Sequence, residues 1–344
     1  MEIIIGLLII AVGAFCQSSS YVPINKIKDW SWESYWIVQG IFAWLLLPFL
    51  GALLAVPQGE SLFSLFANAP SFQLTMTILF GILWGVGGLT FGLSMRYLGV
   101  ALGQSIALGT CAALGTIMGP VLLNIFFQEL NALESLTFAV LMGVAVTLAG
   151  IAIIGVAGSM KAASLSEEEK KAAVKDFNFP KGITIALLAG FMSGCFNVGL
   201  EFGKDINFGE LTDPMFRTLP ATLLVTFGGF LTNAVYCFYQ NQKNGTWGDY
   251  RKTKVWGNNL FFCLLAGLLW YSQFFGLSVG KGFLTSSPTL TTLAFCILMA
   301  LNVVFSNVWG IILKEWKGCS RRTICVLVIG LLVLIFSSFL PQLL

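Results

Sequence analysis

The chain has 344 residues, of which 57% are hydrophobic and only 10% are charged. Soluble domains carry about 25% charged residues, so this chain cannot cover itself with a solvated surface and belongs in a lipid bilayer. It has no histidine, and none of its eight cysteines forms a Cys-x-x-Cys pair. We therefore expect no metal site, no cofactor and, because no basic patch is interleaved with aromatic residues, no nucleic-acid partner.

Ten apolar runs are long enough to cross a membrane, which takes about 20 residues. The predicted spans are 3–23, 36–56, 73–95, 99–126, 135–157, 182–203, 217–240, 257–279, 287–312 and 322–340. The first run has no basic segment before it and no small-residue cleavage site after it, so we expect a retained helix rather than a cleaved signal. The pattern predicts an all-α polytopic membrane protein.

The basic residues are distributed unevenly between the loops on the two sides of the membrane. Sixteen of the nineteen Lys and Arg residues fall on one set of alternate loops, and the other three are Lys204, Arg217 and Lys281. Cytoplasmic loops carry the excess of Lys and Arg. Both termini are therefore predicted to be periplasmic.

A charged segment at 159–181 divides the chain into two parts with five spans each. We interpret it as a cytoplasmic linker between a first five-helix repeat at 1–158 and a second at 182–344. Because five is odd, the two parts would enter the membrane from opposite sides, which is the arrangement of an inverted repeat.

Two pairs of spans support a duplication. Gly81-Ile82-Leu83-Trp84 in the third span returns as Gly267-Leu268-Leu269-Trp270 in the eighth, at an offset of 186. Cys16-Gln17 in the first span aligns with Phe196-Asn197 in the sixth, at an offset of 180. Repeated hydrophobic halves are typical of secondary transporters, which bind their substrate at the interface of the repeats.

The sixth span carries a polar stripe, with Ser193, Asn197 and Glu201 at successive i, i+4 positions. Such a face can line a substrate site, since polar groups inside spans face other helices or a cavity. Burial raises the pKa of a glutamate towards neutrality, so Glu201 is a candidate proton-coupling group. The alternative is an interfacial glutamate paired with Lys204.

The eighth span offers the side chains that bind sugars elsewhere. Trp270, Gln273 and Phe274 lie at i, i+3 and i+4, and Trp84 is the repeat mate of Trp270. Aromatic rings cover the apolar face of a sugar, while amides bond its hydroxyl groups. The alternative is that these residues only pack the helices together.

Further polar candidates for substrate binding are Gln17 and Tyr21 in the first span and Asn302 in the ninth. A side-chain amide can donate and accept hydrogen bonds to a hydroxyl group, or equally to a neighbouring helix. Just before the second span, Trp30 and Trp32 are predicted to anchor the membrane interface, with Glu33 hydrated beside them.

The chain resembles the L-rhamnose–proton symporters, a branch of the ten-helix drug/metabolite transporter superfamily. The fragments that carry the resemblance, in chain order, are Lys28-Asp29-Trp30-Ser31-Trp32-Glu33, Trp84-Gly85, Met95-Arg96-Tyr97-Leu98-Gly99, Gly228-Gly229 with Asn233, Trp270-Tyr271 with Gln273-Phe274-Phe275, and Leu313-Lys314-Glu315-Trp316 before Arg321-Arg322. The resemblance implies a bacterial inner-membrane protein that takes up a 6-deoxyhexose together with protons.

Three features depart from the family pattern. The chain has no histidine, whereas family members contain them. Its ninth span opens with Ser286-Ser287-Pro288-Thr289 in place of bulkier polar and acidic side chains. Glu201 stands where the family has an amide-type or neutral residue, so if proton coupling holds, this carboxylate must serve it.

The sequence thus predicts a proton-coupled importer of L-rhamnose or a related 6-deoxyhexose rather than an enzyme. In this hypothesis Glu201 takes up the proton, and the sugar stacks near Trp270. The alternatives are a metabolite exporter or exchanger on the same fold and, more remotely, a membrane-embedded enzyme or a sensor. An enzyme would need a nucleophile or metal constellation that this sequence does not display.

Overall fold

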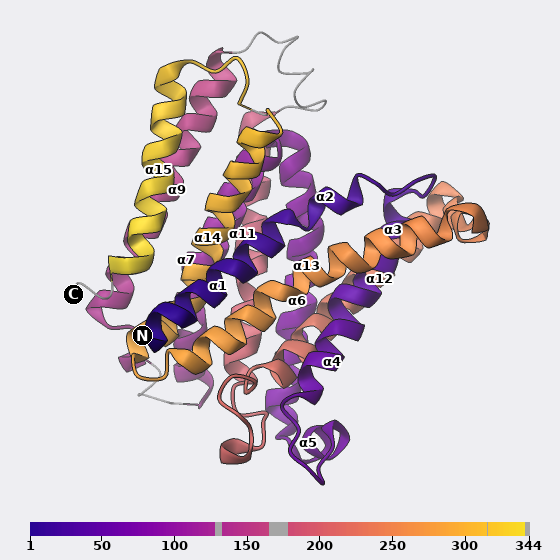
Figure 1. Cartoon of the computed structure of the whole chain (residues 1–344), viewed down its shortest axis with the longest axis vertical. Helices are drawn as coiled ribbons and strands as arrows, with labels where there is room; N and C mark the ends of the chain where they lie inside the picture. The colour runs from indigo at the N-terminus through magenta and orange to yellow at the C-terminus, as the bar shows by residue number, and fades with distance from the viewer. Residues whose placement is uncertain (128–132, 165–177, 315, 341–344) are drawn as a thin grey trace. The chain divides into compact units, whose positions relative to one another are not determined.

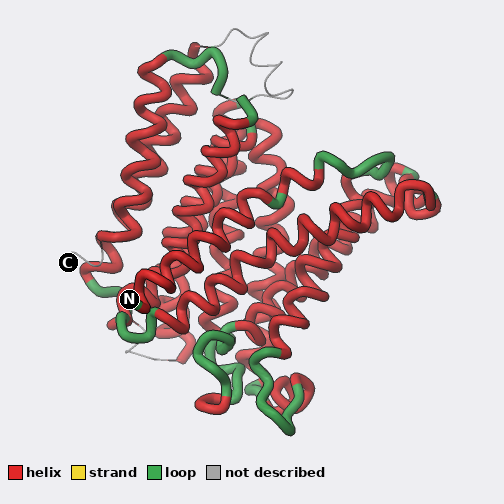
Figure 2. The backbone as a smooth tube through the Cα atoms, in the orientation of Figure 1, coloured by secondary structure: helices red, strands yellow, loops and turns green. Residues whose placement is uncertain are grey.

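The computed structural model describes residues 1–127, 133–164, 178–314 and 316–340. These residues are helical wherever they are regular, and they contain no strand (Figure 2). The elements are α1 (Glu2–Ser19), α2 (Tyr21–Ile24), α3 (Trp32–Gly40), η1 (Ile41–Leu46), α4 (Leu47–Leu53), α5 (Leu62–Asn68), α6 (Ser71–Leu98), α7 (Val100–Phe127), α9 (Phe138–Ser164), α11 (Phe179–Phe202), η2 (Gly209–Leu211), α12 (Leu219–Asn244), η3 (Thr246–Arg251), η4 (Thr253–Val255), α13 (Trp256–Phe283), α14 (Pro288–Ile312) and α15 (Arg321–Phe339).

Ten of the described helical segments are long and apolar enough to cross a membrane. Helices suit this setting because each satisfies its own backbone hydrogen bonds, for which the hydrocarbon offers no other partner. The all-α, ten-span prediction is therefore confirmed. The second span begins earlier than predicted, at Trp32. Residues 165–177 of the predicted linker lie outside the described residues.

The chain forms two compact units, each built from two separate segments. Unit 1 comprises Met1–Val86 and Gly199–Phe283, and unit 2 comprises Gly87–Val198 and Leu284–Leu344. The units differ from the contiguous repeats expected at 1–158 and 182–344, because each unit takes helices from both. The long helices α6 and α11 each contribute one end to unit 1 and the other to unit 2.

In unit 1, α1 and α13 run side by side in opposite directions (Figure 1). Glycines make the close approach possible. A Cβ atom on Gly13 would lie 3.0 Å from the carbonyl oxygen of Ser272 and 3.1 Å from Cα of Gln273. One turn further along α13, a Cβ on Gly276 would lie 3.1 Å from the carbonyl oxygen of Ile9. Small residues at such crossings let two backbones meet inside a membrane.

The glycines of the repeated phrase make contacts of the same kind within unit 1. Gly81 on α6 packs against the backbone of Val225 on α12, where a Cβ would clash with the carbonyl group. Gly267 on α13 packs against η1, where a Cβ would lie 2.9 Å from Cβ of Phe42. Both phrases therefore place their tryptophan one turn beyond a tight helix crossing.

Unit 2 is organised around α7 with α14 and α9 with α15. Hydrogen bonds between side chains join both pairs, from Asn307 Nδ2 to Ser105 Oγ at 2.9 Å and between the hydroxyl groups of Thr147 and Ser337 at 3.0 Å. Between α6 and α7, Gly99 has a φ of 84°. Glycine adopts this left-handed conformation without the steric penalty of a Cβ, so the chain can turn between two long helices in one residue.

One contact occurs once in each unit at positions that the sequence offsets relate. In unit 1, Gly13 of α1 lies against Gln273 of α13. In unit 2, Gly87 of α6 lies against α11, where a Cβ would be 2.7 Å from the backbone nitrogen of Ser193. The offset of 180 relates Gly13 to Ser193, and the offset of 186 relates Gly87 to Gln273.

Candidate substrate site

Five aromatic side chains of unit 1 are linked by ring contacts, and we call them the aromatic cluster. They are Trp36 on α3, Trp44 on η1, Trp84 on α6, and Trp270 and Phe274 on α13. The rings of Trp84 and Trp270 lie 5.6 Å apart at 35°. The ring of Trp44 stands across both, 5.9 Å from Trp84 and 6.0 Å from Trp270. The two tryptophans of the repeated phrase therefore belong to one site.

Glycines on neighbouring turns provide the space for these rings. A Cβ on Gly229 of α12 would overlap the ring of Trp84, and a Cβ on Gly40 would lie 2.7 Å from Cε3 of Trp44. Both tryptophans are consequently buried, with 9% of Trp84 and 4% of Trp44 exposed.

The backbone that carries Trp44 is a single π-helical stretch, η1, between α3 and α4. The N–H of Leu47 bonds the carbonyl of Phe42, five residues back. Pro48, which follows, has no N–H, and its ring excludes the carbonyl group four residues before it, which is that of Trp44. Isolated π-turns of this kind occur frequently at functional sites.

Buried polar atoms on the helices of the cluster have no hydrogen-bond partner among the described residues. On the helices that carry the cluster, they are Nε1 of Trp44, Oε1 of Gln39 and of Gln73, Oγ1 of Thr77 and the hydroxyl oxygen of Tyr271. On α1, which packs against α13, Oε1 of Gln17 has no partner among these residues either. Gln39 and Gln17 are 3% and 4% exposed. By contrast, Nε1 of Trp36 donates to Oδ1 of Asn233 on α12 at 2.9 Å. An unmet buried polar group costs about 1–3 kcal/mol, so the unmet atoms make this region a candidate for binding a polar ligand.

The predicted candidates in unit 1 lie in or beside this cluster. Trp84, Trp270 and Phe274 are members of it. Gln273, next to Phe274, is buried. The antiparallel register of α1 and α13 places Gln17 opposite the turn of α13 that carries Trp270. Tyr21, at the start of α2, is half-buried.

Asn197 and Asn302 belong to unit 2, and both are buried there. Nδ2 of Asn197 donates to the carbonyl oxygen of Gly115 at 2.8 Å, while its Oδ1 has no partner among the described residues. Asn197 is the repeat mate of Gln17, so both units carry a buried amide with a free oxygen at the same place of the predicted repeat.

Glu201 is the last residue but one of α11 and is half-buried. Its end of the helix is packed in unit 1, where Gly199 lies against Val225 and Gly203 against Ala221 and Thr77. The contacts described for Glu201 do not reach the aromatic cluster. The carboxylate therefore lies at the end of its span, close to the loop that follows.

A second concentration of polar side chains lies at one end of unit 1, and we call it the polar network. Its members are Ser31, Glu33, Ser34, Asn241, Asn244, Thr246, Asp249 and Lys252. Glu33 is only 5% exposed, and its Oε1 accepts hydrogen bonds from Asn244 at 3.0 Å and Thr246 at 2.8 Å. The prediction of a hydrated Glu33 was wrong, because the turn after α12 folds over it.

Trp30 was also expected at the membrane surface as an interface anchor, and it is instead buried. Its ring packs edge-on against Tyr250 and Trp256, with centroids 5.8 and 6.2 Å away. Both partners come from the segment between α12 and the first turn of α13, more than 200 positions along the chain. A local pattern of residues gives no sign of such a distant cover.

Asp249 is the centre of the polar network. Its Oδ2 accepts hydrogen bonds from the backbone N–H and hydroxyl of Ser31, both at 2.7 Å, and from the Ser34 hydroxyl at 2.9 Å. Its Oδ1 accepts from Nζ of Lys252 at 2.6 Å. Burial by itself raises the pKa of Asp249, but the hydrogen bonds from Lys252, Ser31 and Ser34 outweigh it and lower the pKa to about 2. The carboxylate therefore stays charged, which suits a structural role.

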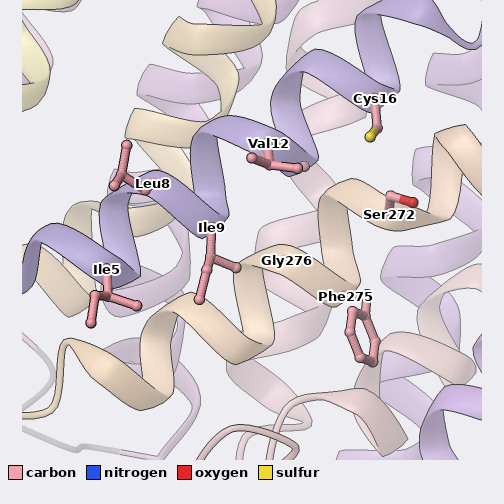
Figure 3. Close-up of a pocket in the computed structure, with 9 residues that line it drawn as sticks. Ile5, Leu8, Ile9, Val12, Cys16, Ser272, Phe275 and Gly276 are labelled. Carbon is pink, nitrogen blue, oxygen red and sulfur yellow. The ribbon is translucent and has the colours of Figure 1, made fainter. Parts of the chain in front are cut away.

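A groove of about 410 Å³ runs along α1 and α13. Figure 3 shows Ile5 at one end and Cys16 with Ser272 at the other, with Ile9 pointing from α1 towards Gly276. Its walls are almost wholly apolar. A sugar would lose its hydration there and gain almost no hydrogen bonds, so this groove is not the substrate site.

Three residues of the site escaped sequence reasoning: Trp36, Gln39 and Trp44. Trp36 and Trp44 lie in the second span, for which no internal repeat was detected. Their spacing of eight residues could have indicated a shared helical face. Nothing local indicated that this face meets Trp84 and Trp270.

The ten described helical segments that are long and apolar enough to cross a membrane define a multi-pass membrane protein. The family described as L-rhamnose-proton symport protein (RhaT) matches residues 1–343. Two relatives are each 31% identical to this chain over 343 residues. They are the L-rhamnose-proton symporters of Yersinia pestis (strain Pestoides F) and Yersinia pseudotuberculosis serotype O:1b (strain IP 31758). The alignments cover 98% of this chain and 96% of each relative. The chain belongs to the L-rhamnose-proton symporter family.

Proposed function

We propose that the protein imports L-rhamnose or a related 6-deoxyhexose together with a proton. The observation that carries the proposal is the aromatic cluster, with unmet buried polar atoms on its helices, in a chain of this family. A 6-deoxyhexose has an apolar face and a methyl group for aromatic rings and hydroxyl groups for amides. Trp84, Trp270 and Phe274 cover the apolar face in this proposal.

The same proposal assigns the sugar's hydroxyl groups to polar side chains of unit 1 and keeps two amides of unit 2 as separate candidates for substrate binding. Those of unit 1 are Gln17, Tyr21 and Gln273. Those of unit 2 are Asn197 and Asn302. The support for Gln17 and Asn197 is that each is buried and has a side-chain oxygen that still needs a donor among the described residues.

Uptake into proteoliposomes tests the direction and the coupling. With the purified protein, labelled L-rhamnose should accumulate when the lumen is alkaline relative to the bath, and a protonophore should abolish the accumulation. L-fucose and other deoxysugars, added as competitors, identify the preferred substrate. Accumulation that ignores the proton gradient contradicts symport, and net export under the same gradient favours the exporter alternative.

Glu201 is the proposed proton-coupling residue, because its carboxylate lies at the end of a span whose polar stripe also carries Asn197. Glu201→Gln should abolish proton-driven accumulation while leaving counterflow exchange of the sugar intact. Glu210→Gln is the matched control, since Glu210 is an exposed carboxylate paired with Arg217 on the loop that follows. Full accumulation by Glu201→Gln would contradict this assignment and would require another group to carry the proton.

For the membrane, we propose the bacterial inner membrane, with both termini periplasmic. The support is the excess of Lys and Arg on one set of alternate loops. We also propose an inverted repeat of 1–158 and 182–344, supported by the contact of Gly13 with Gln273 and its counterpart of Gly87 with Ser193. Alkaline phosphatase fused after Leu344 should be active in intact cells, whereas a fluorescent cytoplasmic reporter there should stay dark.

A further inference from the structure

Within the aromatic cluster, the ring of Trp44 contacts both tryptophans of the repeated phrase. It lies 5.9 Å from Trp84 and 6.0 Å from Trp270, nearly perpendicular to each. It comes from the second span, which the sequence patterns did not single out. Because Trp44 contacts both of these tryptophans, it belongs to the candidate site itself.

The indole N–H of Trp44 is buried and has no acceptor among the described residues. The nearest comparison is Trp36, two turns earlier, whose N–H donates to Asn233. Asn233 is itself held by the carbonyl oxygens of Gly229 at 2.8 Å and Gly85 at 3.3 Å. The described residues therefore supply an acceptor to the indole of Trp36 and none to that of Trp44, which lies at mid-span, where lipid offers none.

The backbone around Trp44 holds the ring in this place. The π-turn of η1 and the missing N–H of Pro48 displace the helix locally. Gly40 leaves room for the ring to lie back over the preceding turn, where any larger residue would press on Cε3. Two independent local features thus orient a donor that the fold itself does not use.

We propose that Trp44 is a specificity-determining residue, whose Nε1–H donates a hydrogen bond to one hydroxyl group of the pyranose while Trp84 and Trp270 cover its apolar face. This inference rests on the proposed function and adds a residue and a role to it. A site built to bond a hydroxyl group rejects an analogue that lacks it, because the buried donor is then left unpaired.

The test is a double-mutant cycle. It combines a variant that lacks the indole N–H of Trp44 with sugars that each lack one hydroxyl group. Affinities are measured by calorimetry in detergent for L-rhamnose and its monodeoxy analogues. For the wild type, the analogue that lacks the hydroxyl group bonded by Trp44 should bind about 10-fold more weakly than L-rhamnose. In Trp44→Phe, the affinity for L-rhamnose should fall about 10-fold. The difference in affinity between L-rhamnose and that one analogue should then vanish. The matched control is Trp30→Phe, which deletes another buried N–H that has no acceptor among the described residues, and it should leave all the ratios unchanged.

If Trp44→Phe does not fold, judged by gel filtration and thermal unfolding, 3-benzothienylalanine at position 44 keeps the bicyclic shape and removes only the N–H. Unchanged L-rhamnose affinity in the variant overturns the inference. So does a parallel loss for every analogue, which is the sign of a purely structural role. Absence of binding to any of these sugars by the wild type overturns the proposed function as well, so the two failures are distinguishable.

Discussion

The aromatic cluster and the polar network both have members on α3, yet their buried polar atoms differ in whether they find hydrogen-bond partners. In the network, Asp249 accepts four hydrogen bonds and Glu33 accepts two. In the region of the cluster, about 15 Å further along the helix from Glu33, Trp44 and Gln39 each keep a buried atom without a partner in the described residues.

The difference separates a region that stabilises the fold from one that serves binding. Buried polar groups in folded proteins are almost always bonded, so those that are not need an explanation. A satisfied network fixes one arrangement of the chain. An unsatisfied site keeps its hydrogen bonds available for a ligand. Four predictions test whether the two regions can be separated in this way.

The largest effect is expected from Trp270→Ala. Removing a ring that contacts Trp44, Trp84 and Phe274 should weaken L-rhamnose binding about 30-fold or more, since central aromatic residues contribute about 2 kcal/mol or more. Trp270→Phe keeps a ring and should recover most of the folded-state stability but only part of the affinity. Calorimetry of both variants measures this. If Trp270→Ala binds L-rhamnose with wild-type affinity, the aromatic cluster is not part of the binding site.

Asp249→Asn should act on stability alone. The pKa of Asp249 falls from its ordinary value of 3.8 to about 2 in the folded protein, which corresponds to about 2 kcal/mol of stability at neutral pH. Chemical unfolding in detergent should show this loss, with the sugar affinity of the folded variant within 2-fold of wild type. Asp213→Asn, at an exposed turn, is the control. A large loss of sugar affinity in Asp249→Asn would show that the polar network also contributes to binding, contrary to the proposed separation.

The same carboxylate predicts an acid limit to stability. Because the pKa is lower in the folded state, the unfolded state binds the proton first as pH falls. The stabilisation by Asp249 is therefore complete above its ordinary pKa of 3.8 and is lost as pH falls towards about 2. Unfolding curves measured across this range should show a decline that is smaller in Asp249→Asn. Parallel curves for both proteins would contradict the assignment.

A smaller effect is expected from Gly229→Ala. The new methyl group would overlap the ring of Trp84, and such overpacking costs about 1–3 kcal/mol. The ring of Trp84 must shift, so L-rhamnose affinity should fall about 5-fold to 10-fold, which corresponds to about 1 kcal/mol of binding free energy. Gly248→Ala, whose Cβ would meet open space beside the polar network, should change neither affinity nor stability. Equal behaviour of the two variants would show that Trp84 has no fixed place in the site.

Sequence reasoning located part of the candidate site and missed part of it. Trp84 and Trp270 were found because a repeated phrase marks them, and Gln17 because an amide in an apolar run is conspicuous. Trp44 was missed because one more tryptophan in an apolar span carries no local signal. Glu33 was misjudged because its cover, Asn244 and Thr246, lies more than 200 residues away.

The sequence by itself determined the class of the protein and the number of its spans. Apolar run length and the scarcity of charge settle those, because a bilayer admits only helices that satisfy their own backbone. Tertiary structure alone decided that Trp84 and Trp270 touch each other, that Trp44 stands across both, and which buried atoms find partners. These depend on how helices far apart in the chain cross, and glycine contacts such as those of Gly13 and Gly81 with the backbones of neighbouring helices make those crossings possible.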